Sequence, residues 1–123
     1  MAKFKEYLTD KGTLILAGKN AKNNEELISQ VEPNEEVFHT KASGSPFVNI
    51  KGKPKIGEIK KAAIFCSKNS QDWRDNKSDV LIHRFKGKDI YKQKSMETGT
   101  FGIKKFKIIK IKKNLIEKFE KCQ

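Results

Sequence analysis

Hydrophobic and polar positions alternate along the first half of the chain in short blocks, each about the length of a strand. Thr13–Ala17 is an apolar run that ends at Gly18, and its length predicts a buried strand rather than a helix. Lys3–Leu8 precedes it, and the turn-forming residues 10–12 separate the two segments. We therefore expect an antiparallel pair of strands at the N-terminus.

A second pair of strands is predicted further along. Val37–Thr40 and Phe47–Ile50 are rich in β-branched and aromatic residues, and residues 41–46 join them tightly. Gly44 permits backbone angles that are closed to other residues, while Pro46 cannot donate a ladder hydrogen bond at the start of the second strand. The two strands are expected to form a hairpin.

Three helices are predicted. Apolar residues recur at helical spacing from Ile56 to Cys66, with lysines on the other side, and indicate a principal helix over about residues 56–69. Its small residues would let it lie close against a sheet. Short helices are expected near residues 23–31 and 114–122.

The starts of the two short helices carry capping signals. Asn23 or Asn24 can cap the first helix, which Pro33 stops. Asn114, followed three residues later by Glu117, resembles a capping box for the second.

The remaining segments predict further strands. Residues 80–85 read as a strand that turns at 86–89, so that residues 90–93 pair back on it. In residues 103–113 the alternation changes phase, which indicates a β-bulge or a strand covered on both faces. Together these elements predict an α+β fold, with residues 1–123 forming one small domain whose mainly antiparallel or mixed sheet is packed by the principal helix.

Aromatic residues are spread through the chain and indicate a folded core. We expect Phe38, Phe47, Phe65 and Phe106 to be buried there. Trp73 differs, because it lies in a polar stretch beside Arg74. Its indole is expected either to stack on a base or to cover an edge of the core.

Charge changes the picture more than any other bulk property. The formal net charge is +12, and it is unevenly placed: residues 1–50 carry six lysines against seven acids, whereas residues 51–123 carry 21 Lys and Arg against eight acids. Such a field attracts polyanions, with nucleic acid first and an anionic surface second. The alternative is a surface filled with lysine only for solubility.

The lysine groups of the second half are the expected phosphate contacts. They give affinity and salt sensitivity but no sequence readout, so shape recognition of structured RNA fits better than base reading. The expected contacts in this half are Lys53, Lys55, Lys60, Lys61, Arg74, Lys104, Lys105 and Lys107.

Membrane, redox and cofactor functions find little support. The longest apolar run, Ala62–Cys66, is far too short to cross a bilayer, and residues 1–10 do not resemble a signal peptide. Cys66 and Cys122 lack disulfide or metal-ligand spacing. We expect a soluble cytoplasmic protein with reduced thiols, without a cofactor or metal, and the sequence leaves its oligomeric state open.

Polar residues after the first buried strand form a possible phosphate-contacting edge. Gly18 is followed by Lys19, Asn20 and Asn24 near a helix start, where backbone N–H groups are otherwise unpaired. A plain strand-to-helix turn with a capping Asn would use the same residues. His39 is expected either to contact a base or ribose or to serve the structure, while His83 is expected to be structural.

These motifs resemble a known family, the RNA-binding domain of NFACT proteins. Gly18-Lys19-Asn20 with Asn24-Glu25 is similar to the segment that opens that domain, and Phe38-His39-Thr40-Lys41 with Gly44-Ser45 is similar to a second motif. Ala62-Ala63 with Ser67, and Gly99–Ile103, resemble two more in the same order. Val37 and Pro46 depart from the family pattern, which usually has Trp and a second His there, so no role of that His is transferred.

The resemblance implies an RNA-binding function. We expect no catalytic residues, because the sequence shows neither a nucleophile paired with a base nor a metal-ligand cluster. Our hypothesis is that the partner is structured RNA, such as tRNA or rRNA, with the ribosome as a further candidate partner and a role in translation or ribosome quality control. The RNA-contacting residues expected in the first half are Lys19, Asn20, Asn24, His39, Lys41, Gly44 and Ser45.

Two other functions remain as alternatives. Asp72, Asp75 and Asp79 are spaced so that a metal could bind between them, as in a small metal-dependent nuclease, although no nuclease signature is present. A general DNA or anionic-surface binder would also match the charge. Membrane binding is disfavoured because the chain shows no strongly amphipathic basic helix.

Overall fold

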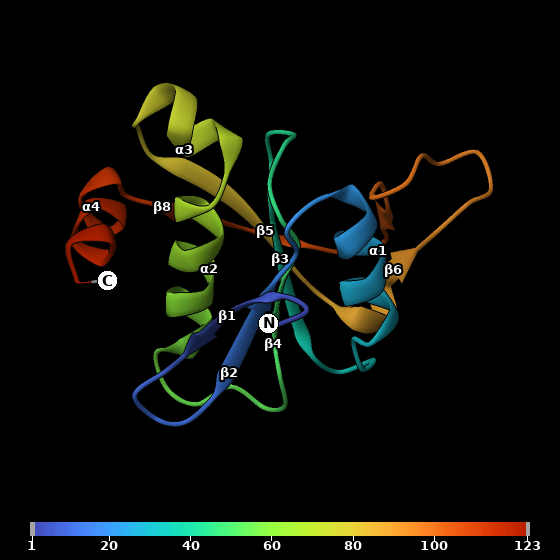
Figure 1. Cartoon of the computed structure of the whole chain (residues 1–123), viewed down its shortest axis with the longest axis horizontal. Helices are drawn as coiled ribbons and strands as arrows, with labels where there is room; N and C mark the ends of the chain where they lie inside the picture. Colours follow the sequence, from blue (N-terminus) through green and yellow to red (C-terminus); the bar gives the residue numbers. More distant parts are fainter. Residues whose placement is uncertain (1, 123) are drawn as a thin grey trace.

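The computed structural model describes residues 2–122, and its centre is a six-stranded antiparallel sheet (Figure 1). The order of strands across the sheet is β1-β2-β4-β3-β5-β8. The strands are β1 (Lys5–Leu8), β2 (Leu14–Ala17), β3 (Glu36–Thr40), β4 (Val48–Ile50), β5 (Val80–Lys86) and β8 (Lys107–Ile111). The α+β class and the antiparallel sheet predicted from the sequence are thereby confirmed.

Both expected strand pairs are present. Tyr7 of β1 lies opposite Ile15 of β2, and Phe38 of β3 lies opposite Val48 of β4. The two pairs join because β2 also pairs with β4. The buried strand β2 thus lies inside the sheet, with the more exposed β1 at its edge.

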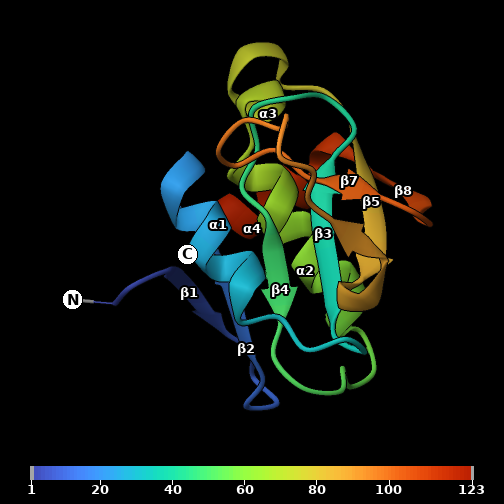
Figure 2. The same ribbon diagram turned by 90° about the vertical axis from the view of Figure 1, so that its right-hand side faces the viewer.

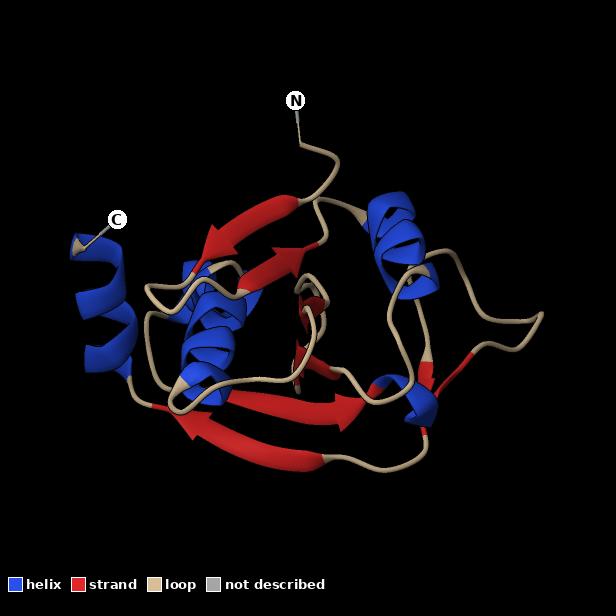
Figure 3. Cartoon of the chain, turned by 90° about the horizontal axis from the view of Figure 1, so that it is seen from below, coloured by secondary structure: helices blue, strands red, loops and turns tan. Residues whose placement is uncertain are grey.

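One face of the sheet is covered by the principal helix, α2 (Glu58–Lys68). Ala62 and Ala63 are fully buried, and such small side chains let the helix approach the strands closely. Seen from below, the strands are arranged around this helix rather than in one plane (Figure 3). The predicted helix is confirmed, but it begins after Gly57, and Ile56 is 90% exposed rather than part of its apolar face.

The opposite face carries a second apolar cluster. Leu27 of α1 (Ala21–Ser29) packs with Val37, Phe47 and Phe85 from the sheet side. A short ribbon, β6 (Ile90–Tyr91) with β7 (Gly102–Ile103), lies over the same face. Each fully buried side chain of this size contributes about 1.5–3 kcal/mol to folding.

The prediction that residues 90–93 pair back on residues 80–85 is wrong. β6 pairs with β7, and β5 pairs with β3 and β8 instead. The short helical turn η1 (Gly87–Asp89) redirects the chain away from β5. The expected bulge in residues 103–113 is also wrong, because β7 and β8 are separate strands in different sheets.

Both helix caps differ from the prediction. Asn20, not Asn23 or Asn24, caps α1 by accepting a hydrogen bond from the Asn23 backbone N–H. In α4 (Lys113–Lys121) the Asn114 capping box is absent, and the Lys113 N–H donates to Asp79 instead. The Asp79 side chain, 34 positions away, therefore accepts a hydrogen bond at the start of α4, where the local sequence predicted Asn114 as the cap.

Trp73 is part of the core. The polar stretch around it forms α3 (Gln71–Asn76), and Ser70 caps this helix. The indole is 1% exposed and its Nε1–H donates to Glu120 of α4. The expectation that Trp73 stacks on RNA is therefore corrected, because α4 covers the ring.

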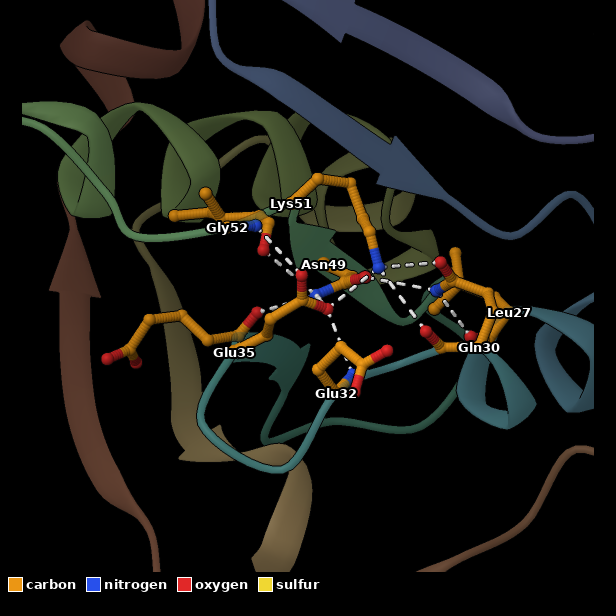
Figure 4. Close-up of polar contacts among 9 residues, drawn as sticks. Leu27, Gln30, Glu32, Glu35, Asn49, Lys51 and Gly52 are labelled. Carbon is orange, nitrogen blue, oxygen red and sulfur yellow. Dashed lines mark hydrogen bonds and ion pairs between the residues drawn. The ribbon is translucent and has the colours of Figure 1, made fainter.

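A buried polar network ties α1 to the end of β4 (Figure 4). The Glu35 carboxylate accepts hydrogen bonds from Lys51 Nζ, at 2.7 Å, and from the Gly52 backbone N–H. Gln30 and Asn49 join the same network. Burial alone would raise the pKa of Glu35, but these donors hold that pKa below its ordinary value.

Candidate nucleic-acid interface

An open cleft of about 790 Å³ lies where four segments meet at one end of the molecule. They are the start of α1, the β3–β4 loop, the α2–α3 region through Asn69 and Arg74, and the loop between β6 and β7. In Figure 2, the β3–β4 loop and the orange β6–β7 loop reach the same end as α3. The motifs identified in the sequence are thereby brought into one place.

The lining of the cleft is basic. Four cationic side chains contribute to it, and they come from different elements: Lys5, Lys19, Lys41 and Arg74. Among residues 2–122, no Asp or Glu lines it. A concave site lined by positive charges concentrates an anionic ligand, because its low-dielectric protein walls focus the electrostatic field.

Gly18 is required for close packing at the back of the cleft. A Cβ at this position would lie 1.9 Å from Asn24 Oδ1. That oxygen accepts a hydrogen bond from the Phe47 N–H, and the Gly18 N–H donates to the Phe47 carbonyl. The expectation that Gly18 leaves its donor for phosphate is therefore corrected, and Asn24 is a buried link between α1 and β4.

The β3–β4 loop is held in shape from within. The Thr40 N–H donates to Ser45 Oγ, and Gly44, with φ of +86°, offers its carbonyl to the Gln71 N–H. The Ser45 hydroxyl is buried, so its observed contacts are structural. Lys41 and Gly44 are exposed on this loop and face the cleft.

Two histidines lie side by side in the cleft wall. His39 and His83 are opposite each other on β3 and β5, and both are partly buried. The His39 Nδ1–H donates to the Thr40 carbonyl at 2.8 Å, and its ring packs on Phe47 with centroids 4.5 Å apart. Burial lowers the pKa of His39 below its ordinary value of 6.5, opposed in part by the Thr40 bond.

The pKa of His83 is lowered as well, by burial first and then by the charge of Lys41. Both rings are therefore neutral near pH 7. Neutral imidazole offers a flat face and one acceptor nitrogen, which suits contact with a base or a ribose hydroxyl better than ion pairing with phosphate.

The β6–β7 loop forms the remaining wall. Glu25 of α1 holds it by accepting hydrogen bonds from Lys92 Nζ, at 2.8 Å, and from the Gly99 N–H, at 2.7 Å. Gly99 lies so close to Ala21 that a Cβ would approach it within 2.9 Å. Phe101 then packs edge-on against Phe47, with centroids 5.4 Å apart.

The lysine groups of the second half do not line this cleft. Lys53 and Lys55 follow β4, whereas the β3–β4 loop precedes it, so the two lie at opposite ends of that strand. Lys60 and Lys61 are on the first turns of α2, and only the other end of that helix, at Asn69, reaches the cleft.

A second, smaller hollow lies on the β5–β8 side. Lys105 and Lys107 line it together with Phe106, and Lys104 comes just before them. Arg84 also borders it, but its guanidinium is paired with the buried Glu36 carboxylate, with Nε and Oε1 2.9 Å apart. The expectation that Phe106 belongs to the core is corrected, because this ring is 48% exposed.

The three aspartates considered for a metal site point to different partners. Asp72 accepts from Asn76, Asp75 from Gln71, and Asp79 from the Lys113 backbone. Within residues 2–122, no group of three or more His, Cys, Asp or Glu side chains is placed to hold a metal ion.

Three parts of the cleft cannot be recognised as parts of a site from local sequence. Lys5 reaches it because its Nζ donates to Asn69, 64 positions away, and nothing local indicates that contact. His83 was expected to be structural, yet it lines the wall. The turn at Gly99 was noticed as a motif, but its role as a wall depends on docking against α1.

Known proteins share the sequence pattern and the fold of this chain. The family model described as "NFACT protein RNA binding domain" matches residues 3–105. Among solved structures, the C-terminal part of a fibronectin/fibrinogen-binding protein from Streptococcus suis aligns with a TM-score of 0.80 and 24% identity. The alignment covers 91% of this chain and 46% of that one, so this chain spans less than half of the solved relative. At that identity the likeness establishes the fold alone.

No curated protein matches the chain in sequence. In the part of the chain that the structure describes, no helix is long and apolar enough to span a membrane.

Proposed function

Because this chain belongs to the family of NFACT RNA-binding domains, we propose that its basic cleft binds structured RNA, with tRNA and rRNA as the ligands. The observation that carries the proposal is the convergence of Lys5, Lys19, Lys41 and Arg74 on a cleft whose described lining contains no carboxylate. Through such RNA the protein would act at the ribosome, in translation or in the quality control of stalled ribosomes.

Recognition in this site would depend mainly on the shape of the RNA. Lysines contact phosphates without reading bases, and the chain has only two arginines. One of them, Arg84, is occupied by Glu36. Arg74 is partly committed as well, since its guanidinium donates to Asn69 and Gln71. Backbone contacts with a folded RNA therefore fit the site better than the reading of a long sequence.

The lysines near the start of α2 are expected to attract RNA from a distance rather than to contact it in the cleft. Lys53, Lys55, Lys60 and Lys61 add to the positive field that draws RNA toward the protein, but they lie away from the cleft. Reversing their charge should therefore affect affinity much less than reversing charges in the cleft.

A salt titration and two double variants test the proposal. Binding of labelled tRNA is measured by fluorescence anisotropy from 50 to 200 mM salt, and four phosphate contacts predict a fall in affinity on the order of a hundredfold. Lys19→Glu with Lys41→Glu should weaken binding at least tenfold, because two attractive contacts become repulsive.

The matched control is Lys53→Glu with Lys61→Glu, which changes net charge equally at the other end. All four side chains are exposed, so neither variant should unfold the protein. Equal losses in the two double variants would show that only net charge matters and would remove the cleft as the site.

A further inference from the structure

We propose that Phe106, resting on His83, is a stacking platform for one unpaired nucleobase of the bound RNA. The proposal rests on the proposed function, because it extends the basic cleft across the open part of the sheet to its edge. In addition to phosphate contacts, the platform gives the protein a preference for RNA that contains unpaired bases.

The two rings form a stacked pair. Their centroids are 4.2 Å apart and their planes are inclined by 26°. Although the imidazole covers one side of it, the phenyl ring is still 48% exposed. An exposed, nearly parallel aromatic pair is the arrangement on which a base can add a further layer, since every base has a π-face.

The platform is continuous with the cleft. His83 belongs to the cleft wall and lies opposite His39 on one side and Ile108 on the other. Residues directly opposite in an antiparallel sheet share a face, so His39, His83 and Ile108 form one row. Ile108 is 54% exposed and extends the apolar surface beside the ring.

Charge selects a nucleic acid as the occupant over a second copy of the chain. Exposed lysines lie beside both rings: Lys105 and Lys107 line the same hollow as Phe106, and the charge of Lys41 acts on His83. Lysines on an edge strand oppose pairing with an identical strand, because two copies would bring like charges together. The phosphates of an RNA would be attracted to the same lysines, while one of its bases covers the apolar surface of Phe106 and Ile108.

The experiment compares two RNAs with the same number of phosphates. One is a blunt, fully paired duplex, and the other is a blunt duplex with the same number of nucleotides in which one 2-aminopurine is unpaired. We expect quenching of the 2-aminopurine on binding, and Phe106→Ala should weaken that complex about tenfold. Phe106→Ala should change binding of the fully paired duplex by less than twofold, and Phe106→Trp should retain the preference for the RNA with the unpaired base.

Ile56→Ala is the matched control, because Ile56 is also an exposed large apolar residue but lies before α2, away from the cleft. Phe106→Ala with unchanged affinity and quenching would overturn the platform, provided that Lys19→Glu with Lys41→Glu still weakens both RNAs. If Lys19→Glu with Lys41→Glu leaves the affinity for both RNAs unchanged, the result counts against the cleft as the binding site. A wild-type dimer by light scattering that Phe106→Ala dissociates would also overturn the platform.

Discussion

At the scale of single residues, the Glu35 carboxylate shows how one buried charge can hold two segments together. It accepts from Lys51, Gly52 and the Glu32 N–H, so the α1–β3 connection and the end of β4 share one acceptor. Such charge-assisted hydrogen bonds are stronger than neutral ones. Lys51 is thereby removed from the set of cations that could contact RNA.

We predict that Glu35→Gln lowers the free energy of unfolding by about 1–3 kcal/mol at pH 7. The folded pKa of Glu35 lies below its ordinary value of 4.5, so the charged form stabilises the fold above that value. This contribution is lost as the pH falls through the folded pKa. Urea unfolding should therefore show a smaller difference between variant and wild type at pH 3 than at pH 7.

Glu32→Gln is the control, because Glu32 lies in the same connection but is exposed. It should change stability by less than about 0.5 kcal/mol at either pH. An equal loss from Glu35→Gln at pH 7 and pH 3 would contradict the role given to the charge.

At the scale of elements, one carboxylate of α1 makes two hydrogen bonds to the β6–β7 loop. Glu25 accepts from both Lys92 and Gly99, at opposite ends of the loop. The loop is otherwise exposed, apart from Phe101 against Phe47. The Glu25 side chain, together with the close approach of Gly99 to Ala21, therefore holds this wall of the cleft against α1.

Glu25→Gln should speed hydrogen exchange of the Gly99 amide about tenfold, because a charge-assisted bond to that N–H becomes a weaker neutral one. The amides of β3 and β5 should exchange as in the wild type. Exchange followed by NMR at single amides is the measurement.

Glu26→Gln serves for comparison, since Glu26 is the adjacent residue and pairs with Lys3 instead. Exchange at Gly99 should not change in that variant. Faster exchange throughout the sheet in Glu25→Gln would mean that the carboxylate supports the whole fold rather than the loop.

The elements predicted from the sequence were those whose signal is local. β2 and α2 carry their own apolar pattern and turn residues, so their existence and type were readable. The pairing partner of β6 could not be predicted, because the sequence pattern allows either β5 or β7. The partner is β7, and this pair packs in the same apolar cluster as α1. The cap of α4 and the burial of Trp73 likewise depend on partners 34 and 47 positions away.

The candidate site divides in the same way. Lys19, Lys41 and the Gly44 turn were found because their motifs are contiguous in sequence. Lys53 and Lys61 share only their charge with these residues, because Lys53 follows β4 and Lys61 lies near the start of α2, both away from the cleft. Net charge reports how strongly a polyanion is attracted but carries no information about position.

At the scale of the whole molecule, the net charge of +12 acts on folding and on binding in opposite senses. Six ion pairs are formed among the described residues, leaving most lysines to repel one another. Self-repulsion of this kind destabilises a compact state, and salt screens it.

We therefore expect the melting temperature to rise by roughly 2–8 °C between 50 and 500 mM NaCl, which corresponds to about 1 kcal/mol of stability. RNA affinity should fall over the same range, because salt competes for the phosphates. Scanning calorimetry of the protein alone gives the first quantity and anisotropy gives the second.

Sodium sulfate at equal ionic strength separates screening from a general salting-out effect, which sulfate strengthens. Charge screening predicts the same rise for both salts at low concentration. A melting temperature that falls with NaCl would show that favourable ion pairs outweigh the repulsion.

The burial of Trp73 beneath α4 also gives the protein an internal optical probe. It is the only tryptophan in the chain, and its indole N–H is bonded to the last helix rather than exposed in the cleft. Its emission should shift to the red when α4 detaches and should stay nearly constant when the cleft is filled. One spectrum can thus distinguish a variant that has lost its ligand from a variant that has lost its structure.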